Sequence, residues 1–162
     1  MCGGIVDGLM VIFSVVFNVV MALVFVFRAQ GRTRLEAKTG PLSNSLLLPF
    51  VTLWLLNLIG NGGLGRLVTP FPAILFLSFD LWYRTLAKRK PVNHPNHWPL
   101  GLYIYLLLFV VGGIMLNGYA FLVSLPYGFL VLSTYYSSLI AYSYYQYSQK
   151  KSRRRPNKFS SS

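Results

Sequence analysis

Long apolar stretches alternate with short polar segments along the whole chain. The first apolar stretch, residues 5–27, is broken only by the polar side chains Asp7, Ser14 and Asn18. A helix over these residues would be roughly 35 Å long, enough to cross the roughly 30 Å hydrocarbon core of a bilayer. The pattern therefore predicts a first membrane span over 5–27.

Two shorter apolar stretches follow. Residues 43–60 are predicted to form a second span, which contains Asn57, and residues 69–87 a third. At the start of the third span, Thr69 is expected to cap the helix. Pro70 is expected at the first helical position, where the missing N–H of proline costs nothing.

Residues 98–147 carry no Asp, Glu, Lys or Arg. As a single helix they would reach roughly 75 Å, more than twice the bilayer core, so the chain must turn back within them. We place the turn at 124–128, with Asn117-Gly118 as the alternative. The predicted spans are then 5–27, 43–60, 69–87, 99–123 and 128–147.

The basic residues predict an orientation. The chain has 15 Lys and Arg against 3 Asp and Glu, and the basic residues gather at 28–38, 84–90 and 150–158. With five spans and the N-terminus outside, all three segments lie on the cytoplasmic side and only Arg66 lies outside, as the positive-inside rule requires. Four spans are the alternative, but they would place at least one basic segment on the wrong side. We predict an all-α, polytopic membrane bundle with a cytoplasmic C-terminus.

Composition supports a membrane protein over a soluble one. Hydrophobic residues make up 54% of the chain, charged residues 11%, and the mean hydropathy is +0.53. Soluble domains carry roughly 25% charged residues, because a surface in water needs them. Since the net charge of +12 is explained by topology, no nucleic-acid partner is expected. The same pattern fits a bacterial inner membrane and a eukaryotic endomembrane or plasma membrane.

The segment after the last span, residues 148–162, is predicted to be a disordered cytoplasmic tail. Its basic residues are expected to anchor the topology and to contact anionic lipid headgroups. These residues are Lys150, Lys151, Arg153, Arg154, Arg155 and Lys158.

A glycine-rich segment at 60–65, GNGGLG, matches the GxGxxG pattern of dinucleotide-binding folds. That fingerprint requires a helix directly after the glycines, with its N-terminus at the pyrophosphate. Here Pro70 and Pro72 interrupt such a helix after one short turn. We therefore interpret the segment as a turn between two spans.

Asp80 is the acid that we place within the body of a span, the third. Acidic side chains inside a membrane are candidates for function. Arg84 lies at i+4 on the same helical face, so an ion pair at the membrane interface accounts for both residues. A role in proton or ion transfer and a subunit contact are the alternatives. His94 and His97 have no nearby acid or thiol to complete a metal site, and we interpret them as part of a polar loop.

Small and polar residues mark two spans as candidate packing faces. In the fifth span these residues are Ser133, Ser137 and Ala141. In the fourth span they are Gly112, Gly113 and Asn117. Packing within the chain, contact with another subunit and a pore lining are the three interpretations. The amides of Asn18 and Asn57, on the first and second spans, also need partners and are candidates to meet each other.

Catalytic chemistry has little support in the sequence, which shows no triad, carboxylate pair, metal cluster or cofactor motif. We therefore expect a non-catalytic membrane protein that serves as an accessory or scaffolding subunit, bound to other membrane subunits or to itself. The alternatives are a small oligomeric transporter or channel that uses Asp80, and an intramembrane lipid-modifying enzyme.

Overall fold

The computed structural model describes residues 2–60, 63–82 and 99–153, and these contain helices and no strand. The bounds are α1 Cys2–Ala29, α2 Thr33–Ser45, α3 Leu47–Ile59, α4 Leu64–Val68, α5 Phe71–Leu81, α6 Pro99–Val123 and α7 Leu125–Arg153.

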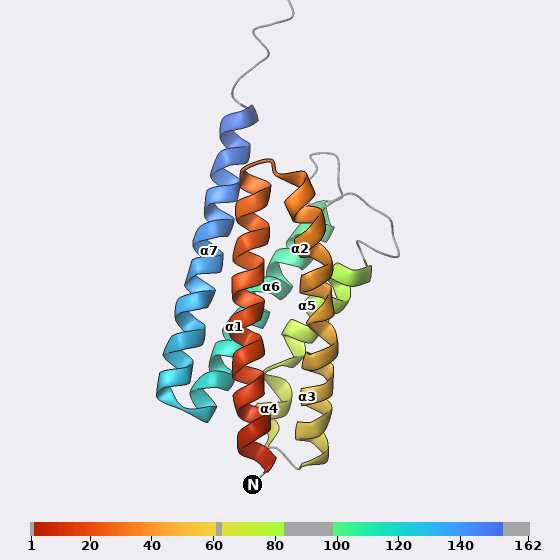
Figure 1. Cartoon of the computed structure of the whole chain (residues 1–162), viewed down its shortest axis with the longest axis vertical. Coiled ribbons are helices and arrows are strands. Elements are labelled where there is room, and N and C mark those ends of the chain that lie inside the picture. The colour runs from red at the N-terminus through yellow and green to blue at the C-terminus, as the bar shows by residue number, and fades with distance from the viewer. Residues whose placement is uncertain (1, 61–62, 83–98, 154–162) are drawn as a thin grey trace, which may run out of the picture.

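These helices form five roughly parallel rods: α1, α2 with α3, α4 with α5, α6, and α7 (Figure 1). Each rod runs opposite to the one before it. The start of α1, the end of α3 and the α6–α7 turn lie at one end of the bundle, which we call the N-terminal end. The α1–α2 turn and the last turns of α7 lie at the opposite end. The first and last rods, α1 and α7, run in the same direction side by side.

Local sequence explains where α1 stops. Gly31 has φ 67, a left-handed conformation that glycine adopts without a steric penalty. Its N–H donates to the carbonyl of Arg28, and the N–H of Arg32 donates to the carbonyl of Phe27. This pair of bonds is the Schellman arrangement, which ends the helix and lets α2 fold back along α1.

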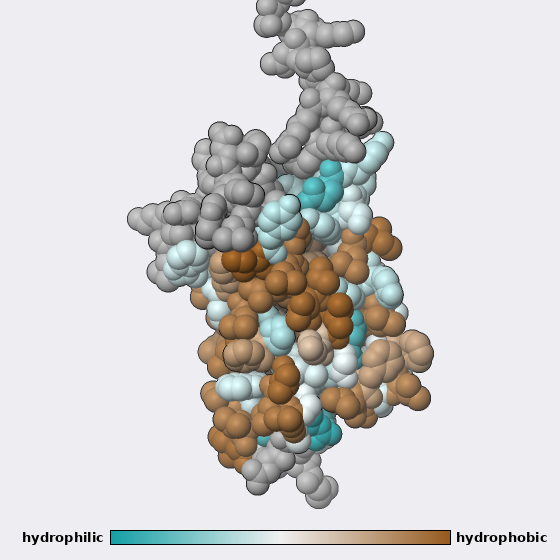
Figure 2. All heavy atoms as spheres, turned by 180° about the vertical axis from the view of Figure 1, so that it is seen from behind, coloured by the Kyte–Doolittle hydropathy of each residue, from teal (hydrophilic) through white to brown (hydrophobic). Residues whose placement is uncertain are grey.

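Four segments of the described chain are long and apolar enough to cross a membrane. They are Gly4–Ala29, Pro41–Ile59, Leu64–Leu81 and Tyr103–Val123. The helix α7, with 29 residues, is also long enough, but its many Ser and Tyr residues make it less apolar than these four. Hydrophobic residues cover much of the middle of the surface in the view of Figure 2.

Aromatic rings fill the centre of the bundle. Phe17 of α1 lies 6.1 Å from Phe50 of α3 and 5.8 Å from Phe76 of α5, measured between ring centroids. Phe109 of α6 lies 5.6 Å from Phe76. These spacings and the edge-on or tilted ring orientations are those that aromatic pairs favour. The four rings therefore tie four of the five rods together.

Helix α6 covers the same residues as the predicted stretch 99–123, and the chain turns at Ser124, the first residue of the predicted turn 124–128. Helix α7 begins at Leu125 and ends at Arg153, so it is longer at both ends than the predicted stretch 128–147. The alternative turn at Asn117-Gly118 is wrong, because both residues lie inside α6. The expectation of disorder from residue 148 is wrong for 148–153, which continue α7, and residues 154–162 lie outside the described residues.

The second and third predicted stretches start earlier than expected. Helix begins at Thr33 and continues through a break at Leu46 to Ile59, and α4 begins at Leu64. The break at Leu46 follows from Pro49, which has no N–H to donate back along the helix. The expected cap at Thr69 is wrong, because its hydroxyl donates to the carbonyl of Gly65 at 2.8 Å.

Candidate functional site

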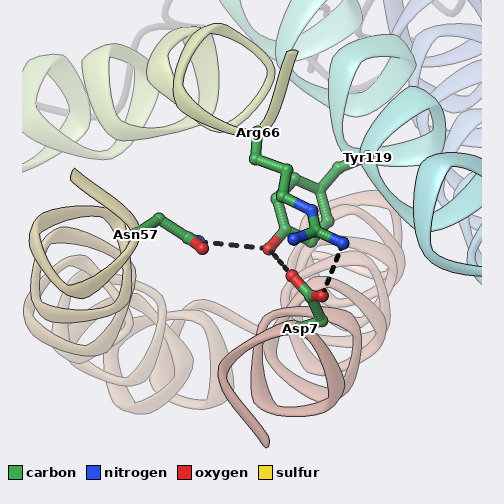
Figure 3. A network of polar contacts seen from close by, with 4 residues as sticks. All are labelled: Asp7, Asn57, Arg66 and Tyr119. Carbon is green, nitrogen blue, oxygen red and sulfur yellow. Dashed lines mark hydrogen bonds and ion pairs between the residues drawn. The ribbon is translucent and has the colours of Figure 1, made fainter. Parts of the chain in front are cut away.

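Four polar side chains from four helices meet near the N-terminal end of the bundle (Figure 3). Asp7 of α1 accepts a hydrogen bond from the Tyr119 hydroxyl of α6 on Oδ1 at 2.7 Å. Its Oδ2 lies 2.9 Å from Nη2 of Arg66 of α4. Nδ2 of Asn57, on α3, donates to the Tyr119 oxygen at 3.1 Å. We call these four residues the Asp7 network.

Short-range contacts hold α4 where Arg66 can reach Asp7. The indole N–H of Trp54, on α3, donates to the carbonyl of Leu67 at 2.8 Å. Gly65 lies against Leu122 of α6, so closely that an added Cβ would come within 3.1 Å of the leucine Cδ1. The five-residue helix α4 is thus fastened on both sides, to α3 and to α6.

The electrostatics of the network are those of a buried, paired charge. Asp7, Asn57 and Tyr119 are buried, whereas the Arg66 side chain is 37% exposed. An isolated carboxylate at this depth would be costly, and pairing with a guanidinium and a hydroxyl offsets that cost. In this arrangement the carboxylate can accept hydrogen bonds, orient the tyrosine and hold Arg66. Among the described residues, no group of three or more His, Cys, Asp or Glu side chains could hold a metal ion.

The Asp7 network was not predicted from the sequence. Asp80 was predicted to be the acid within a span, although Asp7 lies within the first apolar stretch. The available signal was that Asp7 and Arg66 both fall on the outer side in the predicted topology. Nothing in the sequence marked Tyr119 as a partner of Asp7, since the chain has 11 tyrosines.

Asp80 lies near the end of α5 and is 2% exposed. Its predicted partner Arg84, together with His94 and His97, lies outside the described residues. The ion pair between Asp80 and Arg84 therefore stays a prediction.

The possible contact between Asn18 and Asn57 does not form. Nδ2 of Asn18 donates to the carbonyl of Val131 at 3.3 Å and to the hydroxyl of Thr134 at 3.2 Å, so it joins α1 to α7. Asn57 instead belongs to the Asp7 network. The N–H groups of both amides thus find acceptors on later helices, whereas the buried Oδ1 of Asn18 has no hydrogen-bond partner among the described residues.

The predicted face on α7 divides between the surface and the interior. Ser133 and Ser137 are exposed, and their hydroxyls donate to the carbonyls of Phe129 and Ser133 at 2.7 and 3.0 Å. Ala141 is buried. The two serines therefore take no part in packing within one chain, and a contact with another subunit stays a prediction.

The predicted small residues of α6 lie at helix contacts. A Cβ added at Gly112 would come within 3.1 Å of the Ala73 Cα on α5, and one at Gly113 would overlap the Tyr135 ring on α7. Asn117 is buried one turn beyond Gly113. The two glycines thus let α6 approach α5 and α7 closely, as small residues do between membrane helices.

The basic residues predicted to contact lipid lie at the opposite end of the bundle from the Asp7 network. Lys150, Lys151 and Arg153 are in the last turns of α7. The remaining three, Arg154, Arg155 and Lys158, lie outside the described residues. Their contact with anionic headgroups stays a prediction.

Comparisons of the chain with protein-family models, with curated proteins and with solved structures gave no match. The fold itself therefore defines the class. The described chain is all-helical, and four of its segments are long and apolar enough to cross a membrane.

Proposed function

We propose that the chain is a five-span membrane protein, with the N-terminus outside and the C-terminus in the cytoplasm, that works as a non-catalytic accessory or scaffolding subunit. The contact of α7 with α1 supports the fifth span. Asn18 bonds to Thr134, and the rings of Phe25 and Tyr142 lie 5.1 Å apart, so the two helices adjoin over several turns. If α1 crosses the membrane, α7 must share its environment.

The hydroxyl groups of α7 are compatible with lipid. Those of Ser133, Ser137 and Ser143 each donate to the carbonyl four residues earlier, and that of Ser138 to the carbonyl three residues earlier. A hydroxyl bonded within its own helix exposes no unsatisfied donor to hydrocarbon. The surface of α7 is therefore less polar than the hydropathy of its sequence indicates.

The Asp7 network supports the orientation. Arg66 is the one basic residue that this topology places outside. Its ion pair with Asp7 at 2.9 Å neutralises the charge within the folded protein. The apparent exception to the positive-inside rule is thus a paired side chain.

A role in assembly rests on one observation above the others, a stripe of exposed residues on α7. Ser133, Tyr136, Ser137 and Tyr144 form this stripe, which we call the hydroxyl stripe. Small residues let a second helix approach closely, and tyrosines supply contact area and a hydroxyl. The buried rings of Phe17, Phe50, Phe76 and Phe109 fill the centre of the bundle, which favours a packing role over transport through one chain.

The test compares two variants during purification in a mild detergent. The double variant Ser133→Leu/Ser137→Leu is expected to lose a stoichiometric membrane partner, or the second copy in a homo-oligomer, that the unchanged protein retains. Leucine blocks close helix approach, but it keeps the fold because both positions are exposed. The control is Ser78→Leu, an exposed serine on α5, which should retain the partner.

Two outcomes would contradict the proposal. The unchanged protein could purify as a lone monomer, or both leucine variants could keep the partner equally well. A homo-oligomer that is insensitive to the stripe would favour the transporter alternative. In that case Asp80→Asn should abolish flux in liposomes, because the neutral amide cannot carry a proton.

A further inference from the structure

A shallow pocket of about 300 Å³ lies beside the Asp7 network. It is lined by Gly63, Leu64, Gly65, Arg66 and Leu122. Its wall thus combines backbone from the α3–α4 turn, one guanidinium and two leucine side chains. Neither the assembly role nor the packing of the bundle uses this space.

Arg66 has hydrogen-bonding capacity left for a ligand in the pocket. A guanidinium offers five N–H donors in a fixed fork. Among the described residues, its one charged partner is Asp7, which meets Nη2 at 2.9 Å, and the side chain remains 37% exposed. The other donors can therefore reach an oxygen in the pocket without breaking the ion pair.

The rim of the pocket is apolar and exposed. Leu64 is 79% exposed and Leu122 is 58% exposed. In water such leucines would be unfavourable, but against acyl chains they are not. The pocket thus joins a charged donor to a surface suited to hydrocarbon.

The depth of the network matches the boundary between headgroups and hydrocarbon. The 28 residues of α1 span roughly 42 Å, so about 6 Å at each end extends beyond a 30 Å core. Asp7 lies five residues after the start of α1, which is about 7.5 Å along the helix. Arg66, its partner, therefore lies where lipid phosphates meet the apolar core.

We propose that this pocket binds the phosphate of a phospholipid headgroup in the outer leaflet, with Arg66 donating to a phosphate oxygen. The acyl chains lie against Leu64 and Leu122. A lipid is favoured over free phosphate because Asp7 already neutralises the charge of Arg66, so Arg66 attracts a phosphate group only weakly. The contacts of the acyl chains with the leucines supply additional binding free energy. The inference rests on the proposed outward orientation of the N-terminal end.

Gly63 provides a test that leaves the Asp7 network intact. An added Cβ there would meet no atom within 4 Å, and its φ of −53 and ψ of 156 suit any residue. Gly63→Asp places a negative charge in the pocket, and Gly63→Asn places a neutral side chain of the same shape there. Comparing the two variants separates the effect of the added negative charge from the effect of the added side-chain volume.

The measurement is native mass spectrometry of the full-length protein, titrated with phosphatidylglycerol in detergent. Gly63→Asp is expected to weaken lipid binding about tenfold relative to Gly63→Asn, as the loss of one charge-assisted bond predicts. A diacylglycerol with the same chains should bind weakly to all forms. Background binding to the basic residues near the C-terminus is the same in both variants and cancels in the comparison.

Three results would overturn the inference: equal lipid binding by the two variants, equal binding of diacylglycerol and phosphatidylglycerol, or full displacement of the lipid by millimolar inorganic phosphate. The last result would assign the site to a soluble anion. Retention of the assembly partner is measured on the same Gly63→Asp sample. If the two variants bind lipid equally well and the partner is retained, the lipid site alone is refuted. If the unchanged protein has no partner, the assembly role is refuted.

Discussion

Asp7 is a buried carboxylate, and each of its oxygens has its own donor. Oδ1 receives the Tyr119 hydroxyl, and Oδ2 receives the guanidinium of Arg66. Removing one donor leaves a buried acceptor poorly solvated, which costs more than the original bond contributed. Because Arg66 is partly exposed, solvent reduces its share of this energy.

A double-mutant cycle on Asp7 and Arg66 measures this coupling. We expect Arg66→Gln to lower the free energy of unfolding by about 1–3 kcal/mol, since it leaves the buried Asp7 carboxylate without its counter-charge. Asp7→Asn should cost less, because the guanidinium that it leaves unpaired is partly exposed to solvent. The double variant should lose less than the sum of the two single losses. The measurement is thermal or denaturant unfolding in detergent.

Tyr103→Phe serves as the control for these losses, because that tyrosine is 69% exposed on α6 and belongs to neither the Asp7 network nor the hydroxyl stripe. It should leave stability unchanged. Strict additivity of the two single substitutions would show that the ion pair contributes nothing to the fold.

Between elements, α6 and α7 approach each other closely at Gly113. The Tyr135 ring occupies the space of a side chain at this position, and its hydroxyl donates to the carbonyl of Val110 at 3.1 Å. Tyr135 is 4% exposed, so neighbouring atoms keep the ring from moving aside. The contact therefore depends on glycine.

Gly113→Ala should lower the free energy of unfolding by about 1–3 kcal/mol, the usual range for overpacking. Gly118→Ala on the same helix is the control, because its added Cβ would meet only Thr69 Cγ2 at 4.0 Å. It should be neutral or slightly stabilising, since alanine favours helix. The difference between the two melting temperatures in detergent is the readout, and equal values would refute the close contact.

Much of the element pattern could be predicted from the sequence. Apolar length alone predicts α1 and α6, and Ser124-Leu125-Pro126 provides the turn between α6 and α7. Helix starts were harder, because polar residues such as Thr33 and Ser43 continue a helix beyond its apolar part. The Asp7 network was not predicted, since it joins residues as far apart in the chain as Asp7 and Tyr119, and spacing within one helix gives no information on such pairs.

At the scale of the whole molecule, an odd number of antiparallel rods places the start of α1 and the end of α7 at opposite ends of the bundle (Figure 1). The start of α1 lies at the end that carries the Asp7 network. The basic residues Lys150 and Lys151 lie at the other end, with Arg28 and Arg32 at the end of α1. Five crossings follow from this path if α7 enters the bilayer beside α1. If α7 stayed outside the bilayer, both chain ends would lie on one side.

Cysteine labelling in intact cells tests the five-span account most directly. The chain has one cysteine, Cys2 at the start of α1, and the comparison variant is Cys2→Ser/Ser161→Cys, which moves the thiol to the C-terminal end. We predict that a membrane-impermeant maleimide labels Cys2 in intact cells, and labels the C-terminal cysteine only after the membrane is permeabilised. Labelling of both cysteines from the same side would contradict five crossings and remove α7 from the membrane.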